Sequence, residues 1–156
     1  MLIRPRAPED LEACVRALAQ VHPADRYPVD WPDDPGAWLT PRGLHQAWVA
    51  AEGGAVLGHA GLTRDLEVTR LFVVPAARGR GLAGLLLAAL RDAAGDRPLT
   101  LEVSSEATAA IALYERAGWR RTGSSRATWL NAAGEPALLH HYASPPPRGE
   151  AAPPGR

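Results

Sequence analysis

The sequence predicts a single-domain α/β fold, with helices flanking a mixed, mostly antiparallel central sheet. Its 156 residues correspond to about one domain with one sizeable core. Apolar residues recur with helical spacing in some segments and alternate like strands in others. The Gly53-Gly54 pair between two strand-like segments suits a tight hairpin turn, because both residues accept positive φ. These patterns place the domain over residues 1–143.

The first forty residues are expected to form one strand and one helix. The strand covers Leu2–Arg6, and Pro8-Glu9-Asp10 opens the helix with a proline and acidic residues at its positive end. The helix has one apolar face, made by Leu11, Cys14, Val15, Leu18 and Val21. Helical spacing fails from His22 to Gly43, where five prolines predict irregular chain or short helical turns.

The rest of the chain alternates between strands and helices. We expect three antiparallel strands over Trp48–Glu52, Ala55–Leu62 and Glu67–Val74, then a helix from Arg78 to about Ala94, where Gly95 ends it. Next come a strand, a helix and a closing hairpin over Leu99–Val103, Ala109–Trp119, Arg120–Trp129 and Pro136–Tyr142. The proline-rich tail, 144–156, is expected to be disordered.

Composition excludes several classes of protein. Acidic and basic residues balance at 17 each, and no basic stripe appears, so we expect no nucleic-acid partner. The amino terminus has no apolar signal core, and no run approaches the roughly 20 apolar residues of a membrane span. The single cysteine, Cys14, fits a reducing compartment and a buried, inert thiol. These features predict a cytoplasmic protein without a membrane contact.

The most informative stretch is Leu71–Gly84, an apolar strand that passes through a proline turn into a glycine-rich helix start. Gly79 and Gly81 let the backbone approach a ligand, while the first N–H groups of the helix point outward. These donors, the helix dipole, Arg78 and Arg80 favour an anion. The stretch therefore predicts a pyrophosphate-binding loop, with an ordinary strand-to-helix turn as the alternative.

Two other kinds of glycine-rich loop fit this stretch less well. A P-loop requires a lysine, and all 17 basic residues of this chain are arginines. Gly79, Gly81 and Gly84 satisfy the G-x-G-x-x-G dinucleotide pattern. However, the loop lies in the middle of the chain and lacks a second mononucleotide-binding half, which disfavours a dinucleotide fold. A nucleotide-binding domain stays a minor alternative.

Two blocks of the sequence resemble the GCN5-related N-acetyltransferases, the GNAT family. Arg78-Gly79-Arg80-Gly81-Leu82-Ala83 resembles the family's Gln/Arg-x-x-Gly-x-Gly/Ala loop, and 110–119 resembles its helix ending in Leu-Tyr-Glu-x-x-Gly-Phe/Trp. The order of predicted elements matches the family over roughly 1–143. The resemblance implies the acyl-CoA N-acyltransferase fold with a splayed strand pair, acetyl-CoA as cosubstrate, and no metal.

The resemblance also implies which residues bind acetyl-CoA. The backbone of Phe72, Val73 and Val74 would pair with the pantetheine arm, and one of its N–H groups would polarise the acetyl carbonyl. The loop residues would bind the pyrophosphate, and these are Arg78, Gly79, Arg80, Gly81, Leu82 and Ala83. The alternative is that Phe72, Val73 and Val74 are simply core strand residues, and both interpretations can hold, because the backbone can bind while the side chains pack.

Candidate catalytic residues follow from the same match. Tyr114 occupies the position of the family tyrosine that protonates the leaving thiolate, and a phenol pKa near 10 suits that role. Glu67 is the first candidate for the base that deprotonates the amine, with Glu102 as the second. The alternatives are a packing tyrosine and a glutamate paired with an arginine. His59 and His45 have suitable intrinsic pKa values, but lone histidines are more often structural.

One position departs from the family pattern. Many relatives have an asparagine before the tyrosine helix that binds the pantetheine arm, and this chain has Ala107 there. Ser104, Ser105 and Thr108 are the candidates to replace it. The departure favours the rival interpretation, a non-catalytic acyl-CoA-binding or regulatory module with the same fold.

The acceptor is expected to be a primary amine on a small molecule or a protein. In the family, the irregular segment after the first helix flanks the acceptor groove, and here it contains Tyr27, Asp30 and Trp31. Acidic groups beside aromatic rings suit a cationic amine. A homodimer through the closing hairpin stays open, because no specific residue supports it.

Overall fold

The computed structural model describes residues 1–146, and the chain divides into two compact units, Met1–Ala93 and a second that begins at Ala94. The predicted disordered tail lies largely in 147–156, outside the described residues. Within the described part of the chain, no helix is long and apolar enough to cross a membrane.

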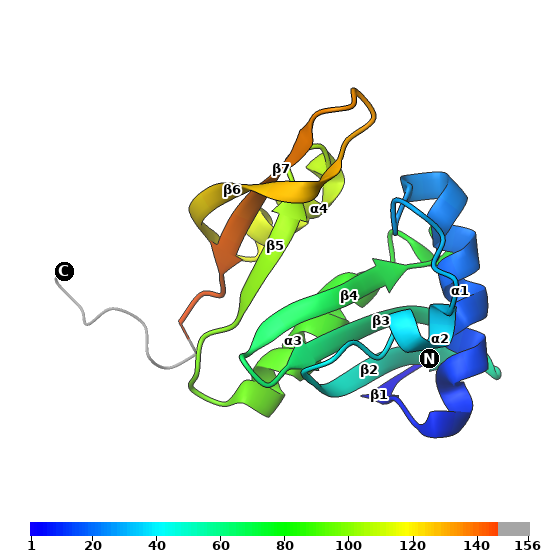
Figure 1. The fold of residues 1–156 in the computed structure, drawn as a ribbon. Coiled ribbons are helices and arrows are strands. Elements are labelled where there is room, and N and C mark those ends of the chain that lie inside the picture. Colours follow the sequence, from blue (N-terminus) through cyan, green and yellow to red (C-terminus); the bar gives the residue numbers. More distant parts are fainter. Residues whose placement is uncertain (147–156) are drawn as a thin grey trace, which may run out of the picture. The chain divides into compact units, whose positions relative to one another are not determined.

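The first unit contains four antiparallel strands that are neighbours in chain order (Figure 1). They are β1 (Leu2–Pro5), β2 (Leu44–Glu52), β3 (Ala55–Thr63) and β4 (Glu67–Val73). Gly53 and Gly54 have φ values of 57° and 81°, which confirms the predicted tight turn between β2 and β3. Strand β2 begins four residues earlier than the expected Trp48.

The first long helix, α1 (Leu11–Asp25), extends beyond its predicted end. The short helical turn η1 (Pro8–Asp10) leads into it. The expectation of irregular chain from His22 was wrong for the first four residues, because Pro23 is accommodated in the last turn. Arg26, with φ of 52°, then ends the helix and its N–H bonds the His22 carbonyl. Farther along, α2 (Pro35–Trp38) is one of the expected short helical turns.

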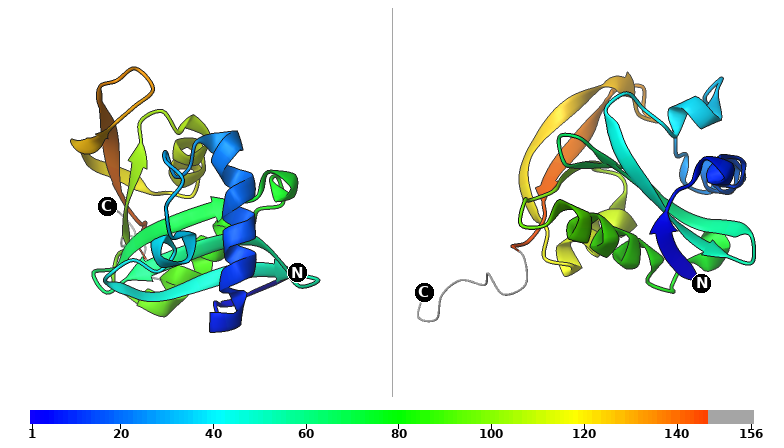
Figure 2. Two further views of the ribbon diagram at one scale, coloured as in Figure 1. Left: turned by 45° about the vertical axis from the view of Figure 1, so that its right-hand side comes forward. Right: turned by 90° about the horizontal axis from the view of Figure 1, so that it is seen from below.

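Helix α3 (Leu82–Ala94) and α1 lie on opposite faces of this four-stranded sheet (Figure 2). Cys14 and Leu18 of α1 are fully buried in a cluster that includes Val49 of β2. Burial raises the pKa of the Cys14 thiol to about 11, in agreement with an inert cysteine. On the other face, a methyl group on Gly58 would lie 3.1 Å from Leu86 of α3, so helix and sheet pack closely.

Strand β4 carries a β-bulge. His59 pairs with Phe72 and Gly61 pairs with Thr69, so two residues of β4, 70 and 71, lie opposite the single residue between His59 and Gly61. Arg70 has φ of 53°, in the left-handed region. The bulge lies immediately before the strand residues that are predicted to face the cosubstrate.

Up to residue 146, the second unit contains a three-stranded antiparallel sheet and one helix that follows α3. Strand β7 (Pro136–Ala143) lies between β5 (Thr100–Ser104) and β6 (Arg120–Leu130), and α4 (Thr108–Arg116) connects β5 to β6. Helix α4 ends before the expected Trp119, because the chain turns at Gly118 with φ of 90°. The hydroxyl of Tyr142 donates to Glu115 at 2.7 Å.

Candidate functional site

The predicted pyrophosphate loop joins β4 to α3 through the turn η2 (Pro75–Ala77). Gly79 and Gly81 are exposed with φ values of 83° and 75°, and nothing lies within 4 Å of a methyl group placed on either. The Gly81 carbonyl accepts from Leu85 N–H at 3.1 Å, so Gly81 is the N-cap of α3. A glycine cap has no side chain to bond the first N–H groups of the helix, which are left to water or an anion.

The two loop arginines are engaged with carboxylates. Arg78 donates to both carboxylate oxygens of Asp25 and also to the Val73 carbonyl, which ties the end of α1 to the end of β4. Arg80 donates to Glu52 at 3.2 and 3.4 Å. Both pairs are about half exposed. The glycine-rich backbone, rather than an unpaired arginine, is therefore the feature of this loop that best suits the predicted anion.

These acidic partners could not be predicted from the sequence. Asp25 lies 53 residues from Arg78, and Glu52 lies 28 residues from Arg80. No motif links such distant positions, and only the packing of α1 and of the β2–β3 hairpin brings the carboxylates to the loop.

Side chains at the end of β4 and just after it pack in the core. The side chains of Phe72 and Val74 are buried, so they pack in the core as the alternative interpretation expected. Val74 N–H donates to the Leu57 carbonyl at 2.8 Å. Pairing of this backbone with pantetheine stays a prediction.

Tyr114 lies on α4 in the second unit and is 7% exposed. Its ring packs beside Trp119 and Tyr142, with ring centroids 5.9 and 6.2 Å apart. Its packing is therefore fixed by aromatic neighbours, and its proton-donor role stays a prediction.

The candidate bases differ in environment. Glu67 is partly buried at the start of β4. Burial lowers the pKa of Arg70, and the charge of Glu67 partly opposes this lowering. Glu102 is exposed, with His141 at 3.6 Å. His45 is exposed, whereas His59 is fully buried and its pKa is lowered to about 4 by desolvation. Glu67 therefore keeps its place as the first candidate.

Ala107 occupies the N-cap of α4, and its side chain makes no capping hydrogen bond. Among the candidate replacements, the Ser104 hydroxyl already accepts a hydrogen bond from Glu106 N–H at 3.2 Å. The helix terminus therefore lacks the side-chain amide that many family members have at this place.

Residues 26–40, which we call the acceptor segment because they are predicted to flank the acceptor, contain exposed and packed side chains. Tyr27 packs edge-on against Trp38 with ring centroids 5.6 Å apart, and burial raises the pKa of Tyr27 to about 12. Arg70 covers one face of Trp38 at 4.0 Å. Asp30 is exposed, and Trp31 is 39% exposed. Asp30 and Trp31 are thus accessible to an acceptor, whereas Tyr27 is held by packing.

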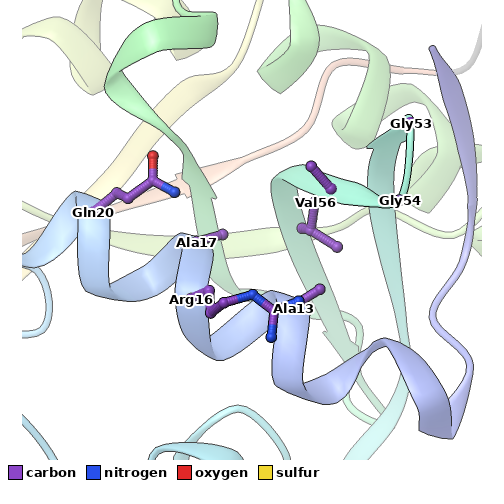
Figure 3. Close-up of a pocket in the computed structure, with 8 residues that line it drawn as sticks. Ala13, Arg16, Ala17, Gln20, Gly53, Gly54 and Val56 are labelled. Carbon is purple, nitrogen blue, oxygen red and sulfur yellow. The ribbon is translucent and has the colours of Figure 1, made fainter.

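A pocket of about 270 Å³ lies between α1 and the turn of the β2–β3 hairpin (Figure 3). Arg16 and Gln20 project from α1 beside Val56 of β3. None of the predicted site residues lines this pocket. Within residues 1–146, no group of three or more His, Cys, Asp or Glu side chains is arranged to hold a metal ion.

Comparisons with known proteins agree with the resemblance. Residues 39–128 match the acetyltransferase (GNAT) domain family. The N-alpha-acetyltransferase RimI of Mycobacterium tuberculosis is 34% identical over 126 residues, which cover 75% of this chain and 77% of that protein. Three further curated relatives are longer, and the chain spans 28%, 30% and 38% of their lengths.

Solved structures share the fold. The ribosomal-protein-S18-alanine N-acetyltransferase of Escherichia coli has a TM-score of 0.74 and 22% identity, with 97% of each chain covered. A putative acetyltransferase of Salmonella typhimurium, solved with acetyl-CoA, has a TM-score of 0.71 and 24% identity, covering 100% of this chain and 99% of that one.

The matched segment includes both sequence blocks, the glycine loop and the tyrosine helix. The family match covers more than half of the chain, and the RimI match covers more than two thirds of that relative. Acetyl-CoA is the acetyl donor of this family. The chain therefore belongs to the GNAT family and carries its acetyl-CoA-dependent N-acetyltransferase domain.

Proposed function

We propose that this chain transfers the acetyl group of acetyl-CoA directly to a primary amine within a ternary complex. The observation that carries the proposal is the loop before α3. Gly79 and Gly81 have positive φ and open surroundings, and Gly81 lies at the start of α3. This arrangement suits the pyrophosphate of the cosubstrate.

Each step of the transfer has a candidate residue. Glu67 takes a proton from the ammonium, so that the neutral amine nitrogen attacks the thioester carbon. A backbone N–H at the end of β4 stabilises the developing oxyanion. The carbon–sulfur bond then breaks, and the Tyr114 hydroxyl donates a proton to the departing thiolate. The nitrogen of the product loses its second proton to water or to the Tyr114 phenolate, which leaves a neutral amide and a free thiol.

The acceptor that we favour is the α-amino group of a peptide. Support comes from the name of the M. tuberculosis relative, an N-alpha-acetyltransferase, which is 34% identical to this chain. The accessible Asp30 and Trp31 suit a cationic ammonium before it loses its proton. We also propose a cytoplasmic location, which the single, buried cysteine supports.

The test begins with calorimetric titration of the protein with acetyl-CoA, NAD and ATP. We expect binding of acetyl-CoA and weaker binding by an Arg78→Ala/Arg80→Ala variant, with Arg42→Ala as an exposed control. Thiol release with peptides and small amines then identifies the acceptor class. Preference for NAD or ATP over acetyl-CoA would contradict the proposal, and preference for small amines would contradict the peptide acceptor.

A second function, a non-catalytic acyl-CoA-binding module, is favoured by Ala107 at the start of α4. Tyr114→Phe separates the two functions. An enzyme would keep its affinity for acetyl-CoA and lose turnover in this variant. A binding module would show no thiol release above background with any amine, in the wild type as well as in the variant.

A further inference from the structure

His59 is the one buried polar or charged side chain that residues 1–146 contain, and it is fully enclosed. Its Nδ1 lies 2.8 Å from the Arg70 carbonyl, and its Nε2 lies 3.0 Å from an Arg6 guanidinium nitrogen. Arginine only donates, so Nε2 must accept and Nδ1 must carry the proton that bonds the carbonyl. The two contacts thus define one neutral tautomer, which agrees with a pKa lowered to about 4 by burial.

The acceptor of the Nδ1 proton is the carbonyl of the bulge residue in β4. Arg70 adopts φ of 53°, a conformation that costs energy for a residue with a Cβ and persists only where its surroundings hold it. His59 lies on the neighbouring strand β3, and its Nδ1–H donates a hydrogen bond to the Arg70 carbonyl. A hydrogen bond from a buried, oriented donor is the kind of contact that fixes such a peptide.

Two neighbours fix the imidazole ring. The ring stacks on Phe72, with centroids 5.3 Å apart and an interplanar angle of 12°. Arg6 bonds its Nε2 and also donates to the Leu39 carbonyl and the Thr40 hydroxyl, each at 2.8 Å. The ring therefore has no freedom to turn away from the bulge.

The side chain of Arg70 is held as well. Its Nε donates to the Trp38 carbonyl at 2.9 Å. Arg6 and Arg70 donate to residues 38–40 of the acceptor segment, and His59 bonds both the Arg6 guanidinium and the Arg70 carbonyl. The bulge and the acceptor segment share one hydrogen-bonded network.

We propose that His59 is a positioning residue for acetyl transfer, whose Nδ1–H fixes the Arg70 peptide and so sets the direction of the β4 backbone N–H groups that face the thioester. The inference rests on the proposed function. His59 does not act as the base, because it is enclosed and both ring nitrogens are already bonded within the protein. It acts through the backbone of the bulge.

The test compares three substitutions. Asparagine places its amide near Nδ1 and retains a donor toward Arg70, whereas glutamine places its amide near Nε2 and phenylalanine has no donor. We expect kcat to fall on the order of 100-fold in His59→Gln and His59→Phe, the loss typical of reacting groups displaced by about 1 Å. His59→Asn should retain at least tenfold more activity than His59→Gln.

The dissociation constant for acetyl-CoA serves as the control. It should change far less than kcat in all three variants, because the glycine loop, which is predicted to bind the pyrophosphate, takes no part in the His59 network. An active wild type with unchanged kcat in His59→Gln and His59→Phe would overturn the inference. A wild type that binds acetyl-CoA but acetylates no amine would instead count against the proposed function.

A second measurement applies even if the variants fail to fold. Nitrogen-15 NMR of the wild-type imidazole reports which ring nitrogen carries the proton. We expect the Nδ1–H tautomer, neutral from pH 8 down to pH 5.5. The Nε2–H tautomer, or a ring that becomes protonated above pH 6, would overturn the inference, because neither state makes both observed contacts.

Discussion

Replacement of Asp10 by asparagine should destabilise the protein in a pH-dependent way. The Asp10 carboxylate accepts two hydrogen bonds from Arg4, at 2.7 and 2.9 Å, and a third from Ala7 N–H at 2.6 Å. The bonds from Arg4 are the main cause that lowers the pKa of Asp10 from 3.8 to about 2. That difference corresponds to roughly 2.5 kcal/mol of folding free energy as an upper limit.

Solvent reduces this figure, because the Asp10 side chain is 12% exposed and its partner Arg4 is 35% exposed. We expect Asp10→Asn to lower the free energy of unfolding by about 1–2 kcal/mol at pH 7. The folded-state pKa is depressed, so the contribution is complete above pH 5 and is lost as the pH falls through 4 toward 2.

Urea unfolding followed by tryptophan fluorescence at pH 7, 5 and 3 measures the difference between wild type and variant. The difference should be equal at pH 7 and 5 and should shrink to roughly half at pH 3. Arg4→Met is the matched variant, because it removes the same ion pair from the other side. A difference that is independent of pH, or smaller than about 0.3 kcal/mol at pH 7, would refute the reasoning.

Three further predictions follow from burial and backbone geometry. Cys14 should react with a thiol reagent only at the rate of unfolding, because it is fully buried with a pKa of about 11; rapid reaction of the native protein would contradict this. Leu86→Ala should cost about 2–4 kcal/mol in urea unfolding, because Leu86 is fully buried. Gly81→Ala should lower the affinity for acetyl-CoA in calorimetry, whereas Gly134→Ala, at a similar φ of 78° in the β6–β7 turn, should not.

The order of the helices and strands could be predicted, because the residues that end them act locally. Gly53-Gly54 and Gly95 turn or end elements through their own positive φ, independently of distant contacts. Where a boundary depends on other residues, the prediction was less accurate. Pro23 suggested irregular chain, but the last turn of α1 accommodates it. The early start of β2 at Leu44 likewise depends on its pairing with Thr63 of β3.

Of the candidate site, the loop backbone was predictable and the charge arrangement was not. The sequence spacing of Gly79 and Gly81 already implies a turn at the start of a helix. The pairing of Arg78 with Asp25 instead depends on where α1 ends, which is a property of tertiary packing. His59 likewise offered no sign of its role, since a histidine in a strand has the same sequence context whether it is a base, a ligand or a buried donor.

The ion pairs of the loop arginines affect which of its groups would attract an anion. Asp25 and Glu52 compensate the charges of Arg78 and Arg80, so the arginines add little net positive charge to the loop. The predicted attraction for a pyrophosphate would then depend mainly on the oriented N–H groups at the start of α3 and on the dipole of that helix. Arg78 contributes differently, because it joins Asp25 to the Val73 carbonyl and holds the end of β4 beside the loop. The sequence motif therefore specifies a backbone shape, and its first arginine serves to keep that shape.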